Sequence, residues 1–302
     1  MAQRPPPPPK PPAPPPPSSR SQPNRPRPPP PSSLQTDPSL YFDESKLPSR
    51  KDKISASEER AKRRRTCRFI EEAGRSLQLP RVPIATAMVF FHRFFAKHSF
   101  AEHDRFEVAV ACVLLAAKTE EAPKKLTHVI QKCHQLKNGG PSSSSSTGKK
   151  KVELLDTKGE EFMKMKERTL LLERIILHTI AFELSIDHPY KPLIEQIKKM
   201  NQPQSQKLEF IDKAKSSRGM NELVQKAMSI ANDSLYTSLC LQHHAKLIAM
   251  ACIYISAKMC KIRPVDGMKW TELLSIDVEV LTCESHIKYH MLYFSLFFCL
   301  TK

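Results

Sequence analysis

Residues 108–118 read VAVACVLLAAK and residues 248–258 read IAMACIYISAK, so one apolar pattern occurs twice with an offset of 140 residues. Five of the eleven positions are identical, and the dipeptide Ala-Met at 87–88 recurs at 227–228 with the same offset. Each stretch is apolar on almost every side, which is typical of the central helix of a bundle. A repeat of this length predicts two similar helical bundles in tandem.

The composition favours an all-α protein. Glycine occurs only seven times in 302 residues, and no Asn-Gly turn separates two strand-like runs. The eight cysteines include no Cys-x-x-Cys pair, so we expect a reduced, intracellular protein. Neither the repeated stretches nor the apolar run at 291–300 reaches the roughly 20 residues that span a bilayer, so no membrane partner is expected.

The chain divides into a tail and two bundles. Seventeen of the 27 prolines lie in residues 1–31, and such a segment lacks the apolar surface that would offset its ordering entropy. We therefore predict a disordered proline-rich tail over residues 1–38. The first bundle is expected over 39–187, with a Ser-rich loop insert at 138–151, and the second over 188–302, each with five helices.

Local signals predict several helix ends. Ser55 and Glu58 form a capping box that begins the first helix. Pro83 suits the first position of the next helix, and Asp104 suits the cap before the first repeated stretch. In the second bundle we expect one helix over 223–241, a helix beginning near His243 and His244, and a last helix over 278–300.

Two charged residues occur inside apolar runs. Lys118 ends the first repeated stretch, and Glu173 lies between Leu172 and Ile175. Charged side chains in such settings normally have partners. One interpretation is a helix-end lysine and an exposed glutamate with no joint role. The other is a pair that lines a surface to which another protein docks.

Basic residues give the chain a net charge of +17. Lys62, Arg63, Arg64 and Arg65 form the densest cluster, which suits a nuclear-import signal or a phosphate-binding patch as well as a solvated helix face. No aromatic residues interleave with them as they do in single-strand binders. We therefore do not expect direct contact with nucleic acid.

The proline-rich tail contains one recognisable ligand motif. Arg20, Pro23 and Pro26 match the Arg-x-x-Pro-x-x-Pro form that SH3 domains bind. Chance matches are expected in a tail this rich in proline, so docking of an SH3 or WW domain stays one of two interpretations.

Catalytic and cofactor motifs are missing from the sequence. Cys283, His286 and His290 have metal-compatible spacing on one helix face, but a fourth ligand is not evident, so we expect no metal. A P-loop, Gly-x-Gly-x-x-Gly, Gly-x-Ser-x-Gly and the His-Arg-Asp and Asp-Phe-Gly motifs of kinases are also absent. We therefore expect neither an enzyme nor a bound cofactor.

In combination, the motifs resemble those of the transcriptional cyclins, the family of cyclins T and K, and the second half looks closer to cyclin K. The resemblance covers about residues 40 to 290. The matching segments are Tyr41-Phe42, 48–50 (PSR), 85–87 (ATA), 92–94 (HRF), 115–126 (LAAKTEEAPKKL), 172–177 (LERIIL), 187–190 (DHPY), 232–235 (NDSL) and 239–242 (LCLQ). The Met-Arg-Ala-Ile-Leu segment of cell-cycle cyclins is missing, and the first helix reads RTCRFI at 65–70 instead.

This resemblance implies the tandem cyclin fold and a nuclear, non-catalytic protein. Such a protein binds and activates a cyclin-dependent kinase that phosphorylates the C-terminal repeats of RNA polymerase II during elongation. In the family, residues matching Lys118 and Glu173 bond the kinase near its αC helix. Glu121, Lys125 and Phe182 are expected at or beside the same surface.

Two alternatives stay open at this point. A cell-cycle cyclin that regulates a division kinase would have the same fold. A general transcription factor of the B type also has two cyclin folds, which bind DNA, but it needs an N-terminal zinc ribbon with paired Cys-x-x-Cys. The corresponding region here is proline-rich.

Overall fold

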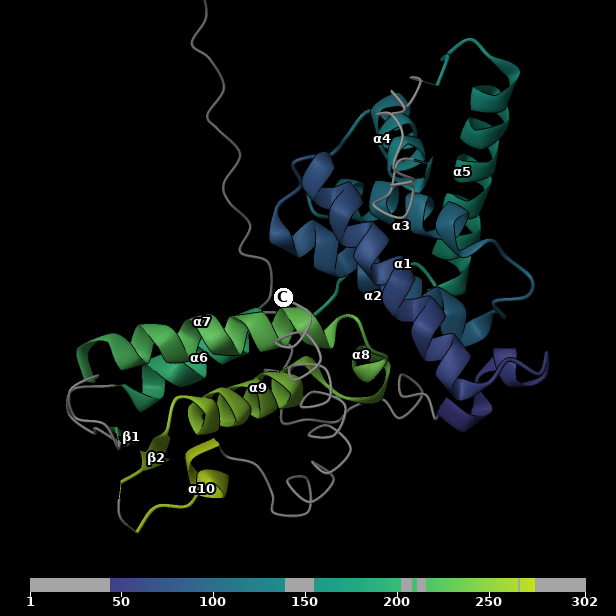
Figure 1. The fold of residues 1–302 in the computed structure, drawn as a ribbon. Helices are drawn as coiled ribbons and strands as arrows, with labels where there is room; N and C mark the ends of the chain where they lie inside the picture. The colour runs from purple at the N-terminus through teal and green to yellow at the C-terminus, as the bar shows by residue number, and fades with distance from the viewer. Residues whose placement is uncertain (1–43, 139–154, 202–207, 211–215, 266, 275–302) are drawn as a thin grey trace, which may run out of the picture. The chain divides into compact units, whose positions relative to one another are not determined.

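The computed structural model describes most of the chain between residues 44 and 274 (Figure 1). The described segments are 44–138, 155–201, 208–210, 216–265 and 267–274. The proline-rich tail, nearly all of the Ser-rich insert and the expected last helix at 278–300 lie outside the described residues. Within the described residues, no helix combines the length and the apolar character that crossing a membrane requires.

The first bundle is built around its third helix. Short 3-10 turns, η2 (Glu44–Lys46) and η3 (Pro48–Arg50), precede the five helices. The helix α3 packs against each of the other four, and residues 108–117 are all buried, as the first repeated stretch predicts. The helices are α1 (Ala56–Ser76), α2 (Arg81–Lys97), α3 (Arg105–Thr119), α4 (Leu126–Asn138) and α5 (Glu160–Thr179).

The helix ends follow the capping residues. Ser55 Oγ accepts a hydrogen bond from the Glu58 backbone N–H at 3.2 Å. Asp104 Oδ1 accepts two backbone N–H bonds at 2.7 and 3.1 Å at the start of α3. The predicted start of α2 was late, because Pro80 takes the cap position and Pro83 lies inside the first turn.

The second bundle repeats this plan around α9. Its helices are α6 (Tyr190–Met200), α7 (Ser216–Ser234), α8 (Leu239–Gln242), α9 (Ala245–Met259) and α10 (Trp270–Leu274). The helix α9 packs against α6 and α7, and His244 is its N-cap residue, as the predicted helix start requires. The helix expected over 223–241 is instead divided into α7 and α8 by a turn at 235–238.

A two-stranded ribbon adds to the predicted all-α fold. The strand β1 (Leu208–Phe210) pairs antiparallel with β2 (Ile262–Pro264), and Leu208 lies opposite Pro264. The two strands follow α6 and α9 respectively. Because they are far apart in the sequence, no hairpin turn signals their pairing.

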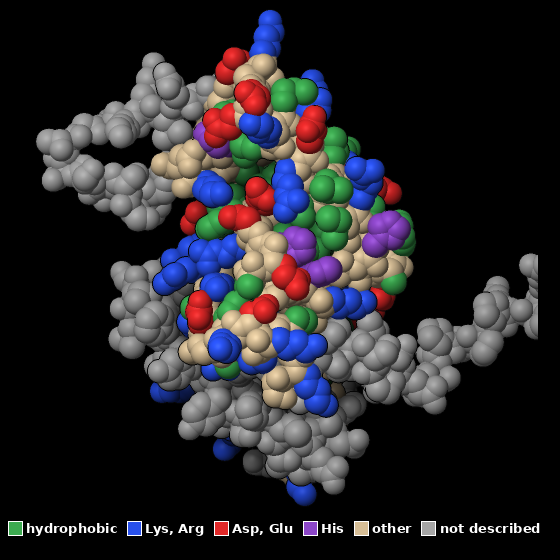
Figure 2. All heavy atoms as spheres, turned by 90° about the vertical axis from the view of Figure 1, so that its right-hand side faces the viewer, with side chains coloured by type: hydrophobic (Ala, Val, Ile, Leu, Met, Phe, Trp, Pro, Cys, Tyr) green, Lys and Arg blue, Asp and Glu red, His purple; other side chains and the backbone are tan. Residues whose placement is uncertain are grey.

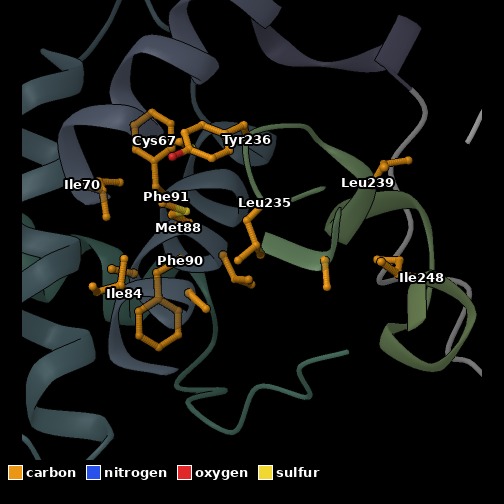
Figure 3. Close-up of a cluster of buried hydrophobic side chains, with 14 of the residues drawn as sticks. Cys67, Ile70, Ile84, Met88, Phe90, Phe91, Leu235, Tyr236, Leu239 and Ile248 are labelled. Atoms are coloured by element: carbon orange, nitrogen blue, oxygen red, sulfur yellow. The ribbon is translucent and has the colours of Figure 1, made fainter. Parts of the chain in front are cut away.

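The turn between α7 and α8 connects the two bundles. Figure 3 shows Leu235 and Tyr236 beside Met88 and Phe91 of α2, within one continuous hydrophobic cluster. The Tyr236 hydroxyl donates a hydrogen bond to Glu71 of α1. The bundles therefore share a core, and the predicted limits at 39–187 and 188–302 remain predictions.

His92 reinforces this connection with polar contacts. Its Nε2 lies 2.9 Å from the Leu235 carbonyl oxygen, to which it donates, and its Nδ1 lies 3.2 Å from Arg63 Nη1, which donates to it. Burial, together with the Arg63 charge, lowers the pKa of His92 to about 3. The imidazole is therefore neutral in the folded chain at neutral pH.

Gly74 sets the spacing between α1 and α2. A Cβ atom at this position would lie 2.5 Å from Ile84 Cγ1 and 2.8 Å from its Cδ1. Ile84 is itself buried in the core, so it has little room to retreat. The two helices cross this closely because residue 74 has no side chain.

Candidate docking surface

Lys118 and Glu173 form an ion pair between α3 and α5. Lys118 Nζ lies 2.7 Å from Oε1 and 2.9 Å from Oε2 of Glu173. The carboxylate is largely buried, at 10% side-chain exposure, whereas the lysine side chain is 49% exposed. The glutamate therefore fixes an ammonium group that solvent, and hence a partner, can still reach.

The same two helices carry a second ion pair. Glu107 Oε2 lies 3.0 Å from Arg168 Nε. The pairs Glu107–Arg168 and Lys118–Glu173 occur in the same order along α3 and α5, so the helices run in the same direction. Their C-terminal ends therefore lie on the same side of the first bundle.

Both helices end in residues with left-handed backbone conformation. Glu121 has φ of 53° after α3, and Ala181 and Phe182 have φ of 52° and 59° after α5. This region is sparsely populated by residues other than glycine. The Phe182 N–H donates to the Leu177 carbonyl at 2.9 Å. This tight turn leaves Phe182 57% exposed, and its ring makes a T-shaped contact with His178, with 5.2 Å between the ring centroids.

The five predicted docking residues are thus only partly joined by contacts. Lys118 bonds Glu173, and its carbonyl accepts from the Glu121 N–H at 3.4 Å. The Lys125 carbonyl accepts from Val129 and begins α4. No hydrogen bond or ion pair that the described residues make links Lys125 or Phe182 to the other three.

An apolar stripe on α5 adds to this surface, which the sequence analysis missed. Met163, Leu170 and Leu171 are 42%, 37% and 40% exposed. Figure 2 faces the side of the molecule on which α5 lies, and hydrophobic side chains are interleaved there with charged ones. The seven-residue steps from 163 to 170 and from 171 to 178 could have indicated an exposed stripe.

For Arg63, the prediction of an accessible basic cluster is wrong. Arg63 is only 2% exposed, and it donates to Glu59 at 2.7 Å and to the Phe95 carbonyl at 2.9 Å. An arginine satisfied in this way inside a bundle is not available to an import receptor or a phosphate. Lys62, half-buried and paired with Glu58, and the exposed Arg64 and Arg65 are the remaining members.

The other sequence motifs lie outside the described residues. These are the SH3-ligand motif of Arg20, Pro23 and Pro26, and the spacing motif of Cys283, His286 and His290. Among the described cysteines, burial raises the pKa of the Cys133 thiol to about 12 and that of Cys112 further. Both thiols therefore stay protonated and act as apolar core residues.

Comparisons with known proteins agree with this architecture. The family model "Cyclin, N-terminal domain" matches residues 39–185. The chain is 37% identical over 241 residues to Cyclin-T1-3 of Oryza sativa subsp. japonica, covering 78% of this chain and 44% of that one. It is 35% and 33% identical over 240 residues to Cyclin-K of Danio rerio and of Homo sapiens, covering 78% of this chain and 48% and 36% of theirs.

Solved structures share the fold at low sequence identity. A chain of the yeast RNA Pol II CTD kinase CTDK-1 complex superposes with a TM-score of 0.62 at 16% identity, covering 84% of this chain and 72% of that chain. A chain of the yeast TFIIK (Kin28/Ccl1/Tfb3) complex gives 0.55 at 20% identity, covering 83% and 96%. These likenesses show the tandem cyclin fold.

Two helical bundles of this kind define a cyclin-fold protein. The family match and the curated relatives show more: the chain belongs to the cyclins and is similar to cyclins T and K, as its motifs indicate. It spans less than half the length of these three relatives. Whole-region identities do not separate cyclin K from cyclin T, so the closer likeness of the second half to cyclin K stays a prediction.

Proposed function

We propose that this chain is the activating subunit of a cyclin-dependent kinase that phosphorylates the C-terminal repeats of RNA polymerase II and so promotes transcription elongation. Similarity to cyclins T and K supports this proposal. In this role the chain performs no catalysis itself. It acts in the nucleus, where RNA polymerase II, the substrate of the kinase, is. The kinase active site belongs wholly to the partner.

The ion pair of Lys118 and Glu173 is the observation that carries the proposal. A lysine ammonium has three N–H donors, and the carboxylate of Glu173 takes two of them. In the proposed complex the third donor binds a carbonyl or carboxylate of the kinase. Because Glu173 already holds the lysine in place, binding loses less side-chain entropy than it would with a freely rotating lysine.

Apolar groups beside the pair would supply most of the buried area. Phe182, Leu170 and Leu171 are exposed large hydrophobic side chains on or just beyond α5. Exposed aromatic residues next to a desolvated charge are typical of interface hot spots. Glu121 and Lys125, both exposed after α3, then act as the charged rim that steers the kinase into register.

Activation follows from differential binding to two states of the kinase. A kinase is active only when its β3 lysine pairs with the αC glutamate, and the cyclin acts by binding the inward position of αC more tightly. Shifting the population from 1:99 to 99:1 takes about 5.5 kcal/mol of differential affinity. An interface of roughly 1,600 Å² is of the size that stable complexes bury.

Reconstitution with elongation kinases tests the proposal. The purified chain should bind such a kinase and stimulate phosphorylation of polymerase C-terminal repeat peptides. The double variant Lys118→Ala/Glu173→Ala should weaken binding while thermal melting stays near wild type. Glu160→Ala/Lys164→Ala is the matched control, because it removes an exposed ion pair, 2.6 Å long, on the same helix.

Other outcomes would favour other functions. Wild-type kinase binding by the Lys118→Ala/Glu173→Ala variant would contradict this docking surface. Stimulation of a division kinase alone, with abundance that oscillates through division, would identify a cell-cycle cyclin. Steeply salt-dependent DNA binding without any kinase partner would identify a general transcription factor of the B type.

A further inference from the structure

Three potential metal ligands meet in the loop between α2 and α3. His98, Glu102 and His103 each place one ligand atom within 4.8 Å of the other two. Within this cluster, His98 Nδ1 and Glu102 Oε2 lie 3.8 Å apart. The loop begins at the C-terminal end of α2, where the helix dipole favours a cation. This cluster has no part in the proposed docking contacts.

The hydrogen bonds of His98 leave the correct ring nitrogen available. Its Nε2 lies 3.0 Å from Thr179 Oγ1, and the Thr179 hydroxyl already donates to the Ile175 carbonyl at 2.7 Å. Thr179 Oγ1 must therefore accept, so Nε2 carries the proton of neutral His98. The lone pair is on Nδ1, the atom that faces Glu102. An outer partner that fixes the tautomer in this way is typical of metal-binding histidines.

His103 supplies a second, independent sign of a missing ligand. Its Nδ1 is one of five buried side-chain nitrogens without a hydrogen-bond partner in the described part of the structure, and a buried polar atom of this kind normally has a partner. The ring is oriented by its edge-to-face contact with Phe94, on which His98 also stacks.

We propose that His98, Glu102 and His103 form a Zn²⁺ site, with water as the fourth ligand. Two histidines and one carboxylate are a ligand set that zinc accepts, and Zn–N and Zn–O bonds of about 2.0–2.2 Å place tetrahedral ligand atoms roughly 3.3 Å apart. His98 Nδ1 and Glu102 Oε2 lie 3.8 Å apart, and all three ligand atoms lie within 4.8 Å of one another. Binding of the ion therefore requires the ligand atoms to approach by up to about 1.5 Å, and rotation of the exposed Glu102 side chain supplies the part that involves its carboxylate. The site would cross-link the α2–α3 loop to itself next to the end of α5.

Titration of the tag-free, chelator-treated chain with ZnCl₂, followed by calorimetry, tests the site. The wild type should bind one equivalent with a step that His103→Ala and Glu102→Gln abolish. Glu102 is 59% exposed, so the Glu102→Gln variant should fold even if His103→Ala does not. Thr179→Val should keep the step but weaken it by about 10–100-fold, the usual effect of losing an outer partner.

Two controls separate this site from others. His128→Ala removes an exposed histidine of α4 and should leave the titration unchanged. His286→Ala/His290→Ala removes the spacing motif outside the described residues and should also leave it unchanged. The proposal is overturned if the wild type binds no zinc, if Glu102→Gln binds as the wild type does, or if only His286→Ala/His290→Ala loses the step.

Discussion

The helices α3 and α9 are the same element in two copies, yet they end in different surroundings. Both bury their central residues, including Cys112 and Cys252. Both are followed by a left-handed residue in register, Glu121 with φ of 53° and Lys261 with φ of 56°. However, Lys118 reaches across to Glu173 of α5, whereas the equivalent Lys258 lies 5.5 Å above the ring of Tyr254 on its own helix.

The comparison distinguishes features that both bundles share from the ion pair of Lys118, which is described in the first bundle. The buried face and the helix end recur because each bundle needs a central helix that stops at the same place. Within the part of the chain that the structure describes, α9 ends at the same place although Lys258 makes no ion pair to a neighbouring helix. The contact of Lys118 with Glu173 is thus a difference between the two copies among the described residues. Four measurements can test this comparison.

The largest effect is expected where the two copies differ in burial. Leu114 is 1% exposed, and Leu114→Ala should destabilise the chain by about 2–5 kcal/mol through the cavity it leaves. Tyr254, at the equivalent position, is only partly buried, so Tyr254→Ala should cost about half as much. Urea unfolding of both variants checks this, and equal losses would show that burial does not distinguish the copies.

A second effect concerns pH at another pair of equivalent positions, His92 and Asn232. The pKa of His92 is lowered to about 3 in the folded chain, whereas it is about 6.5 when unfolded. The stability from its neutral form is complete above pH 6.5 and is lost as pH falls toward 3, because only the unfolded chain takes up the proton. Between pH 7 and pH 5 the loss is about 2 kcal/mol.

The variant His92→Asn tests this with the residue that the second copy already has. Asn232 Oδ1 accepts from the Tyr190 hydroxyl at 2.9 Å and does not titrate. His92→Asn should therefore lose stability at pH 7 but show a shallower fall toward pH 5, measured by urea unfolding at both values. An unchanged acid slope would mean that other groups control it.

A third effect distinguishes the two lysines in kinase binding. Lys118→Ala should weaken association with the kinase by about 30-fold, or about 2 kcal/mol, as expected for a charged residue at an interface centre. Lys258→Ala should leave the affinity unchanged, because Lys258 lies over the ring of Tyr254 on its own helix, outside the proposed docking surface on the first bundle. Surface plasmon resonance with an immobilised kinase measures the affinity of each variant. A similar loss of affinity in both variants would contradict a docking surface centred on Lys118.

The smallest effect is an asymmetry within the ion pair itself. Lys118→Ala leaves the largely buried Glu173 carboxylate without its partner, which should cost about 1–2 kcal/mol of stability. Glu173→Ala leaves a half-exposed lysine that water can solvate, so its cost should stay below about 1 kcal/mol. Thermal melting of the two single variants gives the order, and the reverse order would indicate that the lysine is the more buried group in solution.

Much of this architecture is predictable from periodicity and caps. The repeated stretches indicate the central helices, and Ser55 and Asp104 mark two helix starts, because these signals act within a few residues. The pair of Lys118 and Glu173 is predictable as two charges in apolar runs. The bond between Lys118 and Glu173 is not predictable in this way, because the sequence pattern does not determine how α3 and α5 pack against each other.

The features that were missed depend on contacts between distant segments. Arg63 is one of four consecutive basic residues, and only its spacing from Glu59, Cys67 and Ile70 could have indicated an inward direction. The β1–β2 ribbon and the turn at 235–238 are likewise determined by partners in other parts of the chain. Local propensity carries no information about such partners.

The missing side chain at Gly74 affects more than the two helices that meet there. From α1, Glu71 bonds Tyr236 and Arg63 bonds the His92 that holds Leu235. A methyl group at position 74 would lift α1 away from α2 and so stretch both bonds at once. The close packing of α1 on α2 at Gly74 thus also supports the contacts that join the second bundle to the first.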